Sequence, residues 1–140
     1  MVFAGISKAA VITAAVGGFL FGGIWYGMFS QVWLAATGLD EKEIKKAGWQ
    51  RNALPFILSF AGLLVMAYVL AGIIGHLGPG QVTVRNGLIT AAFVWLGFIV
   101  TTHTINHAFQ GARPVLTFID CGHWLGVLLI QGAIIGLIGI

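Results

Sequence analysis

The chain has 140 residues, of which 59% are hydrophobic and only 8% are charged, and its mean hydropathy is +0.98. A soluble domain carries about 25% charged residues, so this chain cannot cover a water-facing surface, and a soluble globular enzyme is excluded. The remaining class is an integral membrane protein, whose surroundings are the lipid bilayer. The net charge of +3 comes from residues too few to form a nucleic-acid-binding patch, so we expect no nucleic-acid partner.

Four apolar runs follow one another along the chain, at residues 9–29, 54–75, 87–109 and 115–140. Each is long enough to span a bilayer, because a spanning helix needs about 20 residues. The links between the runs are short, which favours helices that are neighbours and antiparallel. The sequence therefore predicts an all-α fold, an integral membrane four-helix antiparallel bundle that forms one transmembrane domain over residues 1–140.

The link between the first two runs is the most polar segment of the chain. Asp40 and Glu43 have the spacing of a helix N-cap and capping box, and Lys45 and Lys46 follow where a helix dipole favours cations. We therefore expect a short interfacial helix between the first and second spanning helices.

The distribution of basic residues predicts the orientation, because cytoplasmic loops carry an excess of Lys and Arg. Two basic residues, Lys8 and Arg85, fall on one side of the membrane. Five fall on the other side: Lys42, Lys45, Lys46, Arg51 and Arg113. The N and C termini are therefore predicted outside, in a cell membrane that we expect to be a bacterial inner membrane.

Glycine is frequent, with 21 residues, and several glycines recur four positions apart in the first and last runs. Small residues at this spacing let helix backbones approach closely in lipid. They predict helix-packing faces, used either inside one chain or at a homodimer seam. These glycines are Gly18, Gly22, Gly23, Gly27, Gly132 and Gly136.

Polar groups that are costly in a bilayer gather at one end of the last two runs. His103, Asn106 and His107 share a helix face by their i, i+3, i+4 spacing, and Asp120 and His123 lie three apart on the next helix. The depths of these residues match across the short turn, so we expect His107 near Asp120 and His103 facing His123. Ionisable groups in a membrane are functional candidates by default.

Several chemistries fit this polar cluster. Imidazoles and a carboxylate are ligands for zinc, a His–carboxylate chain can relay protons, and two facing histidines could ligate a haem. Interhelical hydrogen bonding is the purely structural alternative. The residue types do not choose between these, so metal binding and cofactors stay unknown. Trp25 and Tyr26, near the end of the first run, are expected to anchor at the lipid headgroups.

Two segments resemble a known family. Residues 23–45 begin with Gly-Ile-Trp-Tyr-Gly, continue through Phe29 and Trp33, and end in the acid-rich stretch from Gly38-Leu39 to Lys45. Residues 113–124 begin with Arg-Pro and end with Phe-Ile-Asp-Cys-Gly-His-Trp. These segments resemble the small bacterial membrane proteins of the domain of unknown function 1761 family. The resemblance implies four membrane helices and an unassigned activity, with no catalytic residues to carry over. Asp120 stands where that family usually has Asn, and His123 where it usually has Tyr.

No catalytic motif accompanies the polar cluster, so we lean away from an enzyme. Glycine seams, aromatic anchors and a polar link are sufficient for a structural or accessory subunit of a membrane assembly, which is the function we expect. The partners would be a second copy of the chain or a larger membrane complex. The alternative is a small transporter or channel-like protein that handles protons or metal ions through the His/Asp cluster.

Overall fold

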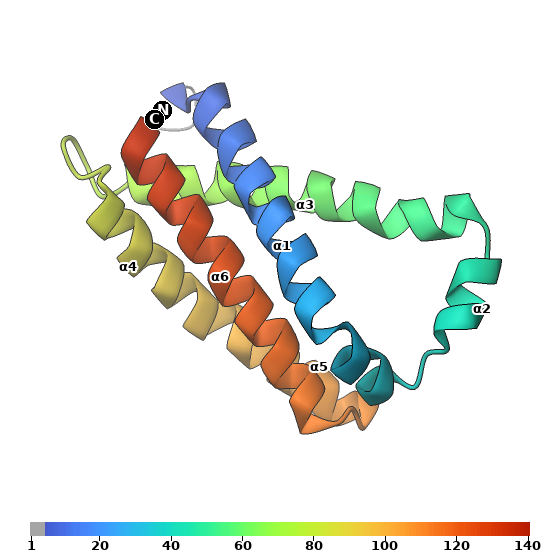
Figure 1. Ribbon diagram of the computed structural model, residues 1–140. Helices are drawn as coiled ribbons and strands as arrows, with labels where there is room; N and C mark the ends of the chain where they lie inside the picture. Colours follow the sequence, from blue (N-terminus) through green and yellow to red (C-terminus); the bar gives the residue numbers. More distant parts are fainter. Residues whose placement is uncertain (1–4) are drawn as a thin grey trace.

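The computed structural model describes residues 5–140, and over that range every regular element is a helix (Figure 1). Four helical spans are long and apolar enough to cross a membrane: α1 (Lys8–Thr37), α3 (Trp49–Gly75), the span Val84–Gln110 and α6 (Pro114–Ile138). The expectation of an all-α, multi-pass membrane protein with four spanning helices is thus confirmed.

The first two spanning helices are longer than their apolar runs. α1 begins after Ser7, whose side chain accepts from the backbone N–H of Ala10, and it continues to Thr37 instead of stopping near residue 29. It ends at Gly38, whose φ of 72° lies in the left-handed region that favours glycine. α3 likewise begins five residues before its apolar run. Hydropathy marks only the lipid-crossing part of a helix, whereas the backbone hydrogen bonds continue into the interface.

The third spanning helix is interrupted by a π-helical segment. α4 (Val84–Val94) leads into η2 (Trp95–Val100), which continues as α5 (Thr101–Gln110). At this level the indole N–H of Trp95 donates to the backbone oxygen of Cys121 on α6, at 2.7 Å. π-Helical turns are frequent at functional sites, and no sequence pattern predicted this one.

The short helix predicted between the first two spanning helices is present as α2 (Glu41–Lys46). The Asp40 side chain caps it by accepting from the backbone N–H of Lys42 at 2.8 Å. Lys45 forms an exposed ion pair with Glu41 at 2.7 Å. Acidic residues in the first turn and basic residues in the last suit the helix dipole.

The four spanning helices do not pack as a closed bundle. α1, α6 and the α4–α5 span lie side by side, and the beginning of α1 lies at the same end as the end of α6 (Figure 1). α4 and α6 approach closely at Gly87 and Gly132, where a Cβ on either glycine would overlap the backbone of the other. The core lies among these helices and the second half of α3, with Leu70, Ile74 and Ile135 nearly inaccessible.

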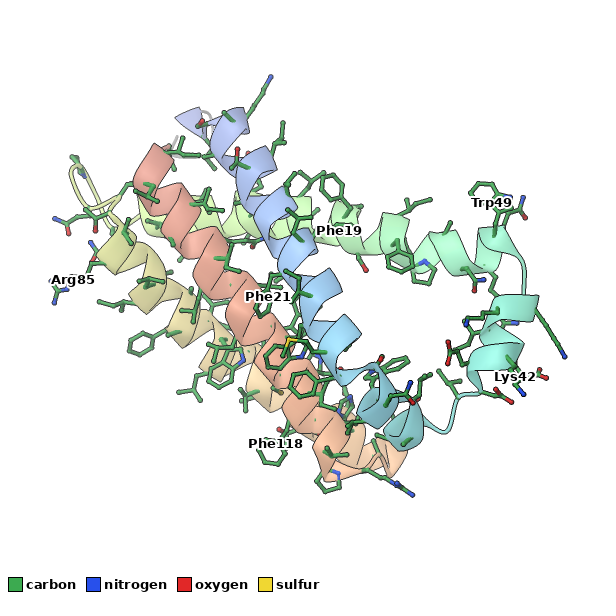
Figure 2. All side chains as sticks on the ribbon, viewed as in Figure 1. Phe19, Phe21, Lys42, Trp49, Arg85 and Phe118 are labelled. Atoms are coloured by element: carbon green, nitrogen blue, oxygen red, sulfur yellow. The ribbon has the colours of Figure 1, made fainter. Side chains whose placement is uncertain are left out.

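The first half of α3 diverges from α1 toward α2 (Figures 1 and 2). Its apolar side chains are exposed, with Leu54 at 53%, Phe56 at 64% and Leu58 at 61%. Contact between the two helices is made further along α3, where Phe60 meets Phe19 edge-on with ring centres 5.7 Å apart. This divergence leaves an opening between α1 and α3 at one end of the molecule.

Candidate functional site

Trp25 and Tyr26 point from α1 to α6, which corrects the expectation that they anchor at the lipid headgroups. The indole N–H of Trp25 donates to the backbone oxygen of Ile119 at 3.0 Å. The hydroxyl of Tyr26 donates to Oδ1 of Asp120 at 2.7 Å. The indole of Trp25 also lies over Gly122, where a Cβ would come within 2.7 Å of the ring. These hydrogen bonds hold both side chains against α6 and not toward the lipid headgroups.

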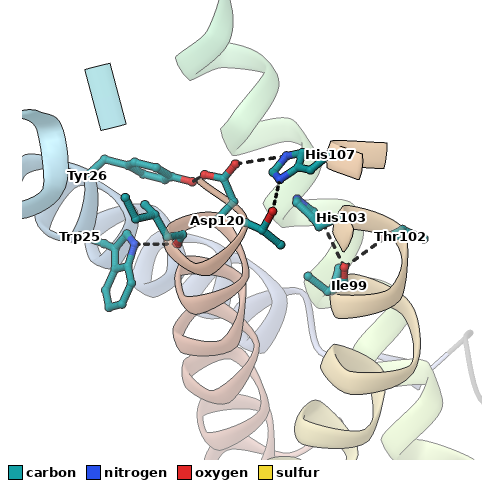
Figure 3. A network of polar contacts seen from close by, with 9 residues as sticks. Trp25, Tyr26, Ile99, Thr102, His103, His107 and Asp120 are labelled. Carbon is teal, nitrogen blue, oxygen red and sulfur yellow. Dashed lines mark hydrogen bonds and ion pairs between the residues drawn. The ribbon is translucent and has the colours of Figure 1, made fainter. Parts of the chain in front are cut away.

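Asp120 is the centre of a polar network that joins α1, α5 and α6 (Figure 3). Its Oδ1 receives the Tyr26 hydrogen bond, and its Oδ2 lies 3.7 Å from Nε2 of His107, an ion-pair distance longer than a hydrogen bond. On the other side of that ring, Nδ1 lies 2.8 Å from the hydroxyl oxygen of Thr117. His107 and Asp120 therefore meet, as their matched depths predict, and they are 13% and 17% exposed.

His123 lies one turn deeper on α6 and is 8% exposed. Its Nε2 faces α1 at Gly22, where a Cβ would lie 2.9 Å away, so only glycine leaves room for the ring. Its ring centre is 4.8 Å from that of Tyr26 and 4.6 Å from that of Trp124. Its Nδ1 is buried without a hydrogen-bond partner, an arrangement that costs free energy in a folded protein.

His103 and Asn106 occupy different surroundings although they share a helix face. His103 is partly buried, with Nδ1 3.1 Å from the backbone oxygen of Ile99 and its ring 5.6 Å from that of His107. A carbonyl oxygen can only accept, so Nδ1 carries the proton, and in the neutral ring Nε2 holds a lone pair. Asn106 is exposed and does not line the cavity described next.

A cavity of about 710 Å³ occupies the opening between α1 and α3 and reaches back to the polar network. His103, Asp120 and His123 lie in its wall, although His107 does not. Most of the remaining wall is apolar, aromatic or glycine. Cavities of this size, apolar with a few convergent polar groups, are typical of small-molecule sites. The other lining residues are Gly18, Phe19, Gly22, Gly23, Tyr26, Gly27, Ser30, Trp33, Leu34, Pro55, Phe56, Ser59, Leu63 and Trp124.

The six candidate packing glycines fall into two groups. A Cβ at Gly18, Gly22, Gly132 or Gly136 would meet a neighbouring helix or the segment that begins α4, so these positions lie at contacts within the chain. A Cβ at Gly23 or Gly27 would meet nothing within 4 Å. Those two line the open cavity and are free to approach something outside the chain.

The metal-binding interpretation finds no support in this geometry. Within residues 5–140, no group of three or more His, Cys, Asp or Glu side chains is placed to hold a metal ion. His103 and His123 lie in the wall of the same cavity, and His107 lies outside it. His107 lies with Asp120, whereas His123 is enclosed by Phe21, Tyr26 and Trp124.

A model of the family described as Protein of unknown function (DUF1761) matches residues 9–136, so the chain belongs to that family, as its sequence resemblance indicated. No curated protein and no solved structure matches the chain. The family's description assigns no activity. The two segments that carried the resemblance are in contact, since Trp25 and Tyr26 bind Ile119 and Asp120.

Sequence reasoning missed Tyr26 and Thr117 as members of the network. The spacing of Gly122 and Gly126 indicated a helix-packing face, but not that the rings of Trp25 and Phe21 pack there. A signal was available for the glycines, because they lie four apart on α6 and face a helix with aromatic residues at the same spacing. Thr117 carried no signal, because a lone threonine near a helix start is usually a local hydrogen-bond former.

Proposed function

We propose that this multi-pass membrane protein is a small transporter-like protein that handles protons at Asp120. The observation that carries the proposal is the position of this carboxylate. It lies within a membrane-spanning helix, in the wall of a cavity, and within ion-pair distance of His107. Carboxylates and histidines placed in this way mark proton and substrate pathways in membrane proteins.

His107 suits the transfer of a proton because two of its protonation states fit the same positions. In the neutral ring the Thr117 hydroxyl donates to Nδ1, while Nε2–H points to the Asp120 carboxylate. In the imidazolium both nitrogens donate, and the Asp120 carboxylate balances the added charge. His107 is three residues from the end of α5, or about 4.5 Å along the helix axis. The pair therefore links the cavity to the nearby membrane surface.

Proton flux into liposomes tests this proposal. The purified protein is reconstituted around a trapped pH-sensitive dye, and a potassium diffusion potential drives protons inward. We expect faster acidification with the wild type than with Asp120→Asn or His107→Gln. Asp40→Asn is the matched control, because it makes the same acid-to-amide change at the cap of α2, outside the cavity. Equal rates for wild type, Asp120→Asn and empty liposomes would reject the proposal.

A structural or accessory role is the second candidate, favoured by the exposed glycine pair. Gly23 and Gly27 lie four apart on α1 without a partner in the chain, a spacing at which another transmembrane helix can pack. Under this proposal that helix belongs to a second copy of the chain. The double variant Gly23→Leu, Gly27→Leu should then abolish a dimer seen by cross-linking in lipid, whereas Ile24→Leu should keep it. A wild-type monomer in lipid would reject this role.

The bacterial inner membrane and the outside location of both termini are also proposals. The outside location of the termini is supported by the excess of Lys and Arg around the α1–α3 and α5–α6 links, and the bacterial inner membrane by the resemblance to small bacterial membrane proteins.

A further inference from the structure

The charge of the cavity wall is one-sided. Asp120 is the acid among the described residues that line the cavity, and no Lys or Arg lines it. Of the two lining histidines, His103 uses its Nδ1 proton on the Ile99 carbonyl, so its Nε2 is an acceptor in the neutral ring, whereas the Nδ1 of His123 is buried. A phosphate or carboxylate group in this cavity would have no Lys or Arg side chain to pair with. A ligand with positive charge would find a carboxylate.

Aromatic side chains surround the same space. They come from α1, α3 and α6. Trp33 meets the network residue Tyr26 edge-on, with ring centres 6.2 Å apart, and Trp124 lies beside His123. Aromatic faces attract cations, and they do so more strongly when water is excluded, as in the recognition of quaternary ammonium groups. The lining aromatic residues are Phe19, Tyr26, Trp33, Phe56 and Trp124.

The cavity is reached from the side, between two membrane helices. Its wall includes Pro55, Phe56 and Ser59 from the half of α3 that diverges from α1. Both serines in the wall donate to backbone oxygens of their own helices, Ser30 to Gly27 and Ser59 to Pro55. Neither hydroxyl therefore has a free proton to donate to a ligand, although its oxygen can still accept, and the neighbouring Pro55 and Phe56 are apolar. A molecule soluble in the bilayer can enter there, whereas a strongly hydrated ion would lose its water without replacement.

From this combination we propose that the cavity binds a lipophilic monocation, a quaternary ammonium or phosphonium group with apolar substituents, with its charge beside Asp120. The proposal rests on the proposed transporter-like function and names its substrate class. The carboxylate supplies the opposite charge, and the aromatic rings supply both apolar contact and attraction to the cation. The volume of about 710 Å³ is within the range of drug-sized ligand sites.

A pair of ions of the same shape and opposite charge tests the proposal. Tetraphenylphosphonium and tetraphenylborate both carry four phenyl rings, so apolar contact is nearly the same for the two. Binding to the purified protein in detergent is measured by equilibrium dialysis, and partition into empty micelles is subtracted. We expect saturable binding of one tetraphenylphosphonium per chain and much weaker binding of tetraphenylborate.

Two variants and a control test whether the cation binds in the cavity beside Asp120. Asp120→Asn should weaken tetraphenylphosphonium binding about tenfold or more, because it removes the Coulomb attraction between a partly desolvated carboxylate and the cation, whereas Asp40→Asn should bind as the wild type does. Trp33→Leu, which leaves the Asp120 hydrogen bonds in place, should weaken binding several-fold. This second variant keeps the test valid if Asp120→Asn does not fold.

Two results would overturn the inference: equal affinity for the two ions, or Asp120→Asn and Trp33→Leu variants that both fold and bind like the wild type. The outcome of this binding test can be distinguished from the outcome of the proton-flux test of the proposed function. Phosphonium binding without Asp120-dependent proton flux would leave the binding site standing and reject proton handling. Proton flux without phosphonium binding would reject the cation site alone.

Discussion

Replacing Gly87 by Ala should destabilise the protein although alanine is the better helix former. Gly87 on α4 faces Gly132 on α6, and an added Cβ would overlap the Gly132 carbonyl group, with the carbonyl carbon 2.7 Å away. The obstacle is backbone rather than the flexible end of a side chain. It cannot rotate away, so the two helices must move apart along a contact that buries Ala91 and Ile135.

The matched control is Gly62→Ala on α3, where a Cβ would meet nothing within 4 Å. Both changes gain the helix propensity of alanine, about 1 kcal/mol. Only Gly87→Ala adds overpacking, which typically costs about 1–3 kcal/mol and should lie at the upper end here. We therefore expect Gly87→Ala to be less stable than Gly62→Ala by about 2–3 kcal/mol.

The assay is unfolding of the purified protein in mixed micelles by increasing sodium dodecyl sulfate, followed by far-ultraviolet circular dichroism. The free energies of the two variants are compared under the same conditions, so the shared propensity gain cancels. If Gly87→Ala proves as stable as Gly62→Ala, the close approach of α4 and α6 at these glycines is refuted.

Three further predictions concern helix packing, the polar network and the orientation of the chain in the membrane. Gly22→Leu should lower the melting temperature in detergent more than Leu20→Ala, because a Cβ at Gly22 meets a buried imidazole whereas Leu20 is 62% exposed; equal melting temperatures would contradict this. Tyr26→Phe should cost about 1.5–3 kcal/mol in the same unfolding assay, since it removes a 2.7 Å hydrogen bond to a carboxylate, and an unchanged value would show that water or another donor replaces the hydroxyl. In a cysteine-free background, Lys45→Cys should resist and Pro79→Cys should accept an impermeant thiol reagent applied to intact cells, whereas the reverse pattern would invert the orientation.

Much of the polar site could be anticipated from depth along the helices. The meeting of His107 and Asp120 follows from two antiparallel helices joined by a short turn, because residues at similar distances from that turn lie side by side. The contribution of Tyr26 could not be derived in this way. It comes from α1, which is distant in sequence, and which neighbour α1 packs against is not encoded in any local pattern.

The amino-acid sequence alone determined the class of the protein, its four spanning helices, its interfacial helix and its family, because each depends on composition or on local order along the chain. Only the tertiary structure decided that α3 diverges from α1, that Gly23 and Gly27 face an open cavity, and that Asp120 lies in its wall. In a membrane, lipid-facing and helix-facing surfaces are equally apolar, so hydrophobic patterning cannot choose the neighbours of a helix. That choice depends on the fit of glycines and rings such as Gly126 with Phe21, which exists only once the helices are assembled.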